Sequence, residues 1–190
     1  MSAIFLSASI PVVGRGTYFE TADPFLIQSA VREFVVAVIG HRQIVWGGHP
    51  AITPMIWTIC EDLNIQYAEA VVLYQSRFFE DAFPEENRRF GNVHLVDAIA
   101  GDREASLLRL REAMLSRRDL AAAVFVGGMD GVEVEYSMFK KFHPDATALP
   151  VAAPGGAARL LAERLRDRNN EYLWDVDFAK LFRAHLDLHD

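Results

Sequence analysis

Two pairs of glycines stand where a ligand would be able to reach the backbone. Each pair follows an apolar, β-branched run that predicts a strand, and each precedes the start of a predicted helix. The paired residues are Gly47, Gly48, Gly127 and Gly128. Turns without side chains let a ligand approach the chain, and the free N–H groups at a helix start attract anions. The two turns therefore predict a site for a nucleotide or a similar phosphorylated ligand, with Met129 and Gly131 beside it.

Glu133 and Glu135 lie just after the second glycine turn. Residues two apart on a helix point about 200° apart around its axis, so only one carboxylate can face the turn. The buried side of this helix is predicted to carry Val132, Tyr136, Phe139 and Phe142. Glu135 lies beside that side, and a carboxylate near a helix start is stabilised in its ionised form. We expect Glu135 to bind ribose hydroxyls or act as a base; otherwise it is a solvated glutamate that complements the helix dipole.

Three further polar residues are candidates for ligand contact. Ser7 and Ser9 end the first predicted strand and would donate hydrogen bonds to a phosphate, unless their small size serves only tight packing. His49 lies in the first glycine turn, where it contacts the ligand or is a solvated loop histidine. Neither turn contains the GxGxxG pattern of a dinucleotide-binding fold, which argues against an ordinary NAD dehydrogenase.

Strand and helix patterns alternate along almost the whole chain. Strands are predicted at residues 4–9, 43–46, 70–75, 93–98, 121–126 and 147–152, and helices at 24–39, 50–63, 102–117, 131–142, 154–167 and 175–188. This alternation predicts an α/β, Rossmann-like fold of three layers, a mostly parallel sheet with helices on both faces. Ligands bind such sheets beyond the carboxyl ends of the strands, where the strand order reverses. The serines and both glycine turns should share that edge.

Two segments add to this pattern. Residues 76–91 form a long loop that mixes phenylalanines with acidic residues, which is typical of a functional lid or of a poorly ordered excursion. The terminal helix carries an apolar stripe of Phe178, Leu181, Phe182 and Leu186. This stripe would either support a dimer or cover the chain's own sheet.

Composition narrows the class of protein. The 190 residues, 51% of them hydrophobic, fit one domain over 1–190, with a core at about 4–165 and a terminal amphipathic helix over 171–190. A net charge of −7 argues against a broad nucleic-acid surface. No apolar run approaches the ~20 residues of a membrane span, and no secretory signal is visible, so we expect a cytoplasmic protein.

Metal and thiol chemistry find no support in the sequence. The single cysteine, Cys60, lies on the apolar side of a predicted helix and is interpreted as a small buried hydrophobe. The six histidines show no ligand spacing, so no metal and no cofactor are expected.

The motifs resemble those of the SLOG superfamily, which includes the LOG ("lonely guy") phosphoribohydrolases and the Smf/DprA proteins. Residues 127–135 resemble the LOG signature PGGxGTxxE after its proline, which Val126 replaces. Glu135 takes the place of its glutamate and Val132 that of its threonine, and one extra residue, Met129 or Asp130, lies inside the turn. Gly47 and Gly48 resemble the earlier LOG turn. Arg111 precedes a methionine at about the place of the LOG arginine.

The chain resembles divergent bacterial SLOG domains of nucleotide signalling and phage defence more closely, including the stretch 102–107. This resemblance implies a module that senses a nucleotide-derived ligand such as ADP-ribose or cyclic ADP-ribose. Arg103 or Arg111 would then neutralise phosphate charge, unless both lie on a solvated helix face. It also implies a homodimer and an effector domain or protein partner.

Two other functions stay open beside the sensor. One is hydrolysis or transfer at a nucleoside N-glycosidic bond, as in LOG enzymes and deoxyribosyltransferases, with Glu135 and Arg111 as catalytic residues. The other is a scaffold whose aromatic loop and terminal helix only mediate assembly.

Overall fold

Six parallel strands form a single sheet in a computed structural model that describes residues 2–63, 70–165 and 174–188. The strands are β1 Ala3–Ser9, β2 Gln43–Trp46, β3 Val71–Ser76, β4 Asn92–Val96, β5 Leu120–Gly127 and β6 Thr147–Val151. Their order is β4-β3-β2-β1-β5-β6, and every neighbouring pair is parallel. The predicted α/β, Rossmann-like fold is confirmed.

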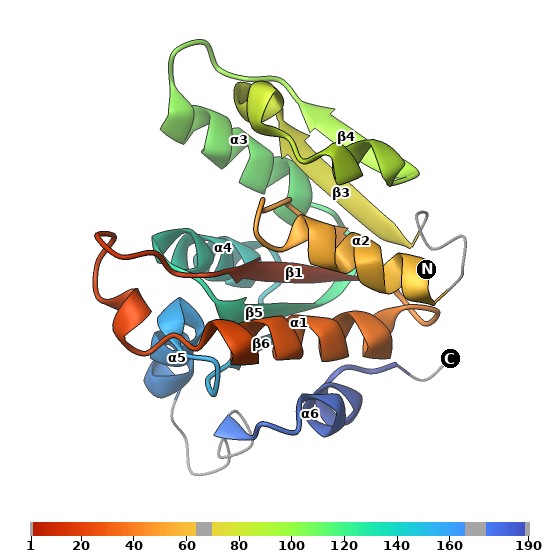
Figure 1. The fold of residues 1–190 in the computed structure, drawn as a ribbon, viewed down its shortest axis with the longest axis vertical. Helices are drawn as coiled ribbons and strands as arrows, with labels where there is room; N and C mark the ends of the chain where they lie inside the picture. Colours follow the sequence, from red (N-terminus) through yellow and green to blue (C-terminus); the bar gives the residue numbers. More distant parts are fainter. Residues whose placement is uncertain (1, 64–69, 166–173, 189–190) are drawn as a thin grey trace.

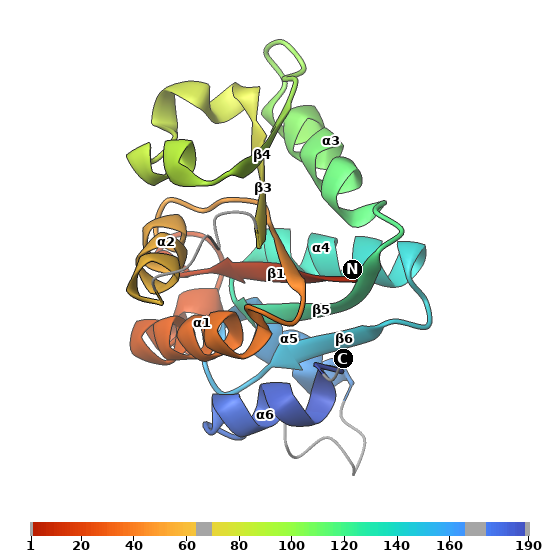
Figure 2. The ribbon, with the colours of Figure 1, turned by 90° about the vertical axis from the view of Figure 1, so that its right-hand side faces the viewer.

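The helices cover both faces of this sheet (Figure 1, Figure 2). One face carries α1 Pro24–Val38, α2 Thr53–Asp62 and α6 Phe178–His185, and the other carries α3 Arg103–Leu115, α4 Asp130–Phe142 and α5 Gly156–Arg164. Each face has its own buried apolar cluster. Among the described helices, none has the length and apolarity that crossing a bilayer requires.

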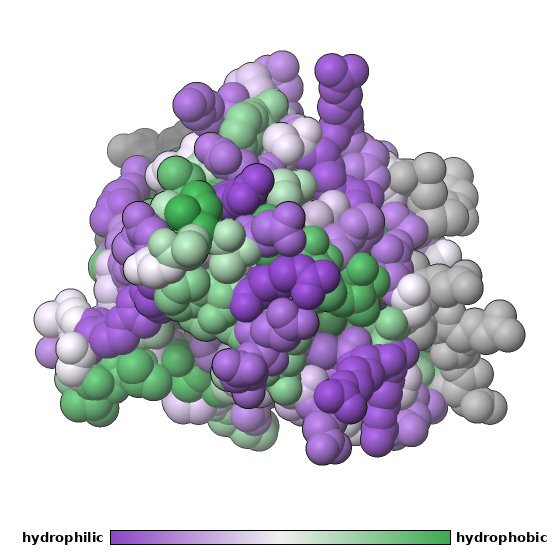
Figure 3. All heavy atoms as spheres, turned by 90° about the horizontal axis from the view of Figure 1, so that it is seen from above, coloured by the Kyte–Doolittle hydropathy of each residue, from purple (hydrophilic) through white to green (hydrophobic). Residues whose placement is uncertain are grey.

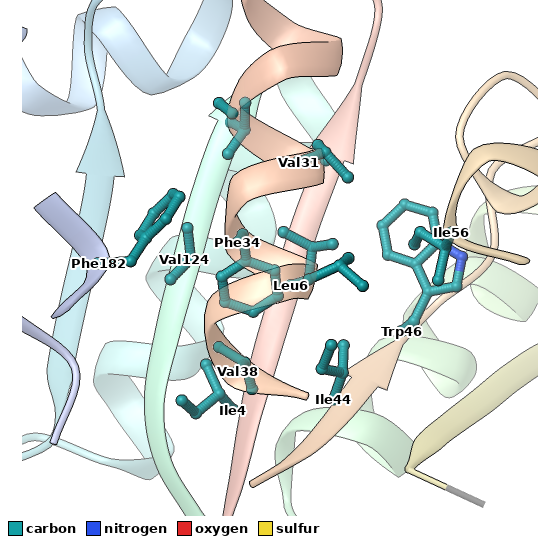
Figure 4. Close-up of a cluster of buried hydrophobic side chains, with 14 of the residues drawn as sticks. Ile4, Leu6, Val31, Phe34, Val38, Ile44, Trp46, Ile56, Val124 and Phe182 are labelled. Carbon is teal, nitrogen blue, oxygen red and sulfur yellow. The ribbon is translucent and has the colours of Figure 1, made fainter. Parts of the chain in front are cut away.

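Helix α1 shows how local chemistry sets an element. Asp23 caps its start by accepting hydrogen bonds from the N–H groups of Phe25 and Leu26, and Pro24 occupies the first turn. Gly40, with a φ of 89°, lets the chain turn away after the last helical residue. The inner side of α1 packs on β1, β2 and β5, where Phe34 and Leu6 lie at the centre of the cluster (Figure 4).

Helix α6 covers its own chain. The whole apolar stripe of the predicted terminal helix is buried, and the Phe182 ring meets the Phe34 ring edge-on at 5.5 Å between centroids. The stripe therefore packs against α1 instead of being free for a dimer. Residues 171–173 and 189–190 of that predicted segment lie outside the described residues.

The structure also shows short helices in the predicted loop and two exposed apolar residues in the helices α3 and α4. The predicted loop 76–91 contains two 3-10 helices, η3 Arg77–Ala82 and η4 Glu85–Arg89, and the hydroxyl of Ser76 accepts a hydrogen bond from the first of them. Leu108 is 46% exposed because it lies about 200° around α3 from Leu110, which faces the sheet. Phe142, where α4 ends, is 40% exposed.

Candidate functional site

A cavity of about 400 Å³ opens at the carboxyl ends of β1, β2 and β3. The chain leaves β1 toward β2 on one side and reaches β5 on the other, so the strand order reverses beside this cavity. Its walls come from the strand ends, the segment between β1 and α1, the segment η3, and the helices α3 and α4. The lining includes ten of the predicted residues: Ser7, Ser9, Gly47, Gly48, His49, Arg103, Arg111, Met129, Gly131 and Glu135.

Glu135 lies at the centre of the polar groups in the cavity. The hydroxyl of Ser7 donates a hydrogen bond of 2.5 Å to Oε2 of Glu135, and Nε of Arg111 donates one of 3.3 Å to Oε1. The side chains of Arg111 and Glu135 are only 14% and 18% exposed. Three elements, β1, α3 and α4, thus bring an acid, a guanidinium and a hydroxyl into one water-poor site.

The protonation state of Glu135 follows from burial. Burial raises the pKa of the Glu135 carboxyl above its ordinary value, while Arg111 and Ser7 act in the opposite direction. The expectation that a helix start would hold this group ionised is wrong. Helix α4 begins at Asp130, so Glu135 lies in the second turn, beyond the reach of the helix dipole.

Glu133 points away from the cavity, as the spacing predicted. It accepts a hydrogen bond of 2.6 Å from the hydroxyl of Tyr18 and forms an ion pair of 2.6 Å with Arg164. The hydrogen bond to the Glu133 carboxylate is the main reason that the pKa of Tyr18 rises to about 12. This acid ties the segment after β1 to helices α4 and α5.

The first glycine turn forms part of the cavity wall. Gly48 has a φ of +71°, and a Cβ there would lie 1.4 Å from the amide nitrogen of Gln75. A Cβ on Gly47 would lie 3.1 Å from Met114. Because Gly48 lacks a Cβ, the amide of Gln75 can lie against the turn, at 3.5 Å from the carbonyl of Gly47.

His49 lines the cavity, and its ring is hydrogen-bonded to the backbone of its own turn. Its Nδ1 accepts a hydrogen bond of 3.3 Å from the N–H of Ala51, and burial lowers its pKa. A neutral ring whose Nδ1 is an acceptor carries its proton on Nε2. His49 therefore acts as a hydrogen-bond donor in a wall of the cavity.

The second glycine turn does not line the cavity, which differs from the expectation for Gly127 and Gly128. The N–H of Gly128 donates to the carbonyl of Ser9 at 2.8 Å, and its carbonyl accepts from Ala157 at 2.9 Å. A Cβ on Gly127 would lie 2.6 Å from Ile27. Close packing of β1, α1 and α5 explains these glycines, and it holds Ser9 and the start of α4 in place.

The rim carries charged and aromatic side chains that sequence reasoning did not single out together. Arg103 forms an ion pair with Glu104 at 2.6 Å, and its guanidinium lies 5.8 Å from the ring of Phe79 in η3. The predicted lid segment thus does border the cavity. Arg15 and Gln75 also line it, and neither was predicted. Only their positions in the sequence could have indicated them: Arg15 lies between two glycines after β1, and Gln75 is the second-last residue of β3.

Metal-binding groupings of three or more His, Cys, Asp or Glu side chains do not occur in the part of the chain that the structure describes. A cation would therefore find no ready ligand set at the described residues of the cavity. The charged groups that line it pair arginines with carboxylates.

Comparison with known proteins gives one family match. The SLOG cluster3 family matches residues 17–186. No curated protein matches the chain. Among solved structures, the chain is similar to TM1055, an X-ray structure from the Northeast Structural Genomics Consortium, with 13% identity and a TM-score of 0.47 over 86% of this chain and 81% of that chain.

Proposed function

The chain belongs to the SLOG cluster3 family, and we propose that it binds a nucleotide-derived ligand in the cavity beside β1. The ligand class is ADP-ribose, cyclic ADP-ribose or a similar phosphorylated nucleoside. The observation that carries this proposal is the joining of Glu135, Arg111 and Ser7 by hydrogen bonds at the edge where the strand order reverses. A buried acid in a preformed cavity is typical of a binding or catalytic site.

Each wall of the cavity suits one part of such a ligand. Glu135 would accept hydrogen bonds from ribose hydroxyls. The backbone N–H groups at the start of α4, near Met129 and Gly131, would hold a phosphate with a guanidinium from the rim. The wall with Gly48 and His49 offers a donor and close backbone approach to the rest of the ligand.

Thermal shift tests binding directly. We expect at least one of AMP, NAD, ADP-ribose and the cyclic ADP-ribose isomers to raise the unfolding temperature, since ligand at 100 times its Kd adds about 2.7 kcal/mol of stability. Glu135→Gln should weaken this effect, and Glu133→Gln, which changes the neighbouring acid outside the cavity, should not. If none of these ligands stabilises the folded protein, the scaffold hypothesis takes precedence.

A second candidate function is hydrolysis of a nucleoside N-glycosidic bond. The raised pKa of Glu135 next to the Arg111 guanidinium favours it, because such a carboxyl can take a proton from water. The water oxygen then bonds to the anomeric carbon, the C–N bond breaks, and its electron pair leaves with the base, which takes up a proton. Release of free base by the wild type, lost in Glu135→Gln and kept in Glu133→Gln, would identify the enzyme; stabilisation without release identifies the sensor.

Cellular context and assembly follow from the family resemblance. We propose that the chain acts in the cytoplasm in nucleotide signalling and phage defence, as a homodimer that couples to an effector domain or protein partner. Apolar side chains exposed along β4 and α3 support self-association, among them Val93, Leu95 and Leu108, and Figure 3 shows hydrophobic surface on this side of the molecule. Sedimentation equilibrium of the wild type and of Leu95→Glu tests it: a monomeric wild type contradicts the proposal.

A further inference from the structure

Arg15 is an unassigned cation at the mouth of the cavity. It lies in the segment between β1 and η1 Tyr18–Glu20, at the left of Figure 1, and it lines the same cavity as Glu135. Gly14 and Gly16 flank it with φ values of 88° and 69°. A Cβ on Gly14 would meet nothing within 4 Å, so the chain around Arg15 is open on that side.

The partner of Arg15 is easily exchanged. Its Nη2 lies 2.9 Å from Oδ1 of Asp130, with the two side chains 48% and 66% exposed. Ion pairs this exposed contribute about 0–1 kcal/mol, because water screens both charges. The pyrophosphate of ADP-ribose would offer the guanidinium oxygens in a fork geometry and two negative charges, whereas the Asp130 carboxylate offers one.

The segment that carries Arg15 is anchored at both ends and open at its tip, because Pro11 is buried just after β1 and Tyr18 is bound on the other side. Tyr18 holds its base through Glu133, which is itself paired with Arg164. Before Arg15, by contrast, Val12 and Val13 are 51% and 79% exposed, so little apolar packing holds the tip. A change of partner by Arg15 therefore requires no loss of buried contacts at these residues.

Resting on the proposed function, we infer that Arg15 binds a phosphate of the ligand at the mouth of the cavity. Without the ligand, its guanidinium pairs with Asp130. Ligand phosphate displaces the Asp130 carboxylate from the guanidinium. Asp130 also lines the cavity and repels the same phosphate, so the two residues act on affinity in opposite directions. A purely structural ion pair would make the two variants behave alike.

The test measures the Kd of ADP-ribose and of adenosine, which lacks phosphate, by calorimetry. Arg15→Gln should weaken ADP-ribose binding about 10- to 100-fold, the range for a hydrogen bond to a charged group. Asp130→Asn should tighten it about two- to fivefold, since it frees Arg15 from a surface ion pair. Neither variant should change the affinity for adenosine. Glu163→Gln breaks the partly exposed ion pair with Arg159 in α5, outside the cavity and away from the Arg15 segment, and serves as the control, with unchanged affinity for both probes.

The outcomes separate this inference from the proposal beneath it. Wild-type protein that binds ADP-ribose, with Arg15→Gln equally tight, overturns the inference alone. The same holds if Asp130→Asn weakens binding as much as Arg15→Gln does. A wild type that binds none of the nucleotides tested above overturns the proposed function, and the role of Arg15 with it.

Discussion

Gly48 is the residue at which backbone conformation and cavity shape depend on each other most directly. Its φ of +71° disfavours any residue with a Cβ, and that atom would overlap the amide of Gln75 in the cavity wall. Gly101 has nearly the same φ, +72°, but a Cβ there would meet nothing within 4 Å. Alanine substitutions at Gly48 and Gly101 therefore separate the effect of backbone strain from the steric effect on Gln75.

We expect Gly48→Ala and Gly101→Ala each to lower the free energy of unfolding by about 1–2 kcal/mol, the cost of a left-handed conformation. Only Gly48→Ala should also weaken ligand binding, because the Gln75 side chain must move within the cavity. Urea unfolding and calorimetry measure the two effects. Equal affinity of both variants for ADP-ribose would show that the turn does not shape the site.

At the residue scale, helix spacing predicted Glu135 and the resemblance to LOG motifs predicted Arg111, but neither gave the electrostatics of the candidate site. Both predictions were possible because helix spacing and short motifs are local properties of the chain. The raised pKa of Glu135 was missed, because it depends on burial by β1 and α3, which are distant in sequence. Arg15 was missed for the same reason: its place at the cavity depends on how a segment without regular structure folds back.

The connection between α3 and β5 shows how a short segment joins two elements electrostatically. Arg117 donates two hydrogen bonds to the carboxylate of Asp119, at 2.9 and 2.6 Å, and one of 3.3 Å to the hydroxyl of Tyr74 in β3. The bonds from Arg117 are the main reason that the pKa of Asp119 falls below its ordinary 3.8. Asp119 is therefore more acidic in the folded chain than in the unfolded one.

A lowered folded-state pKa stabilises the protein above the unfolded pKa, and this stability is lost as pH falls through the folded value. We expect Asp119→Asn to be less stable than the wild type by about 0.2–1 kcal/mol near neutral pH, the range for a partly exposed pair. The difference should shrink as pH falls below about 3.8, where the wild-type carboxyl becomes protonated. Denaturant unfolding at several pH values measures it, and a difference that persists in acid would assign the effect to packing.

Elements with strong periodicity were predictable, and those set by tertiary contacts were not. The six strands and the start of α1 follow from apolar runs and from the Asp23–Pro24 cap. The 3-10 helices of residues 77–89 were missed because their phenylalanines and acidic residues show no regular period. Leu108 is an apolar residue of α3 that is exposed, because α3 packs against the sheet through the opposite side, which carries Leu110 and Met114.

The order of the strands in the whole molecule, not any single motif, creates the cavity. Strand β1 lies between β2 and β5, so segments far apart in sequence end at one edge. Sequence alone predicted this edge from the general rule for parallel sheets, but not that the second glycine turn would lie outside the cavity lining. Gly127 and Gly128 lie close to Ile27, Ser9 and Val132, and a side chain at either glycine would overlap these residues.

Helix α6 packs on α1 at the end of the described chain, and a substitution there measures how much α6 contributes to the stability of the fold. Phe182 is fully buried against Phe34 of α1, whereas Phe25, in the first turn of α1, is 73% exposed. We expect Phe182→Ala to lower the free energy of unfolding by about 3–5 kcal/mol, the cost of a large buried cavity. Phe25→Ala should change it by less than about 0.5 kcal/mol. Since α6 does not line the cavity, the folded fraction of Phe182→Ala should bind ADP-ribose with wild-type affinity in calorimetry. A cost below about 1 kcal/mol would show that α6 is not part of the cooperative core.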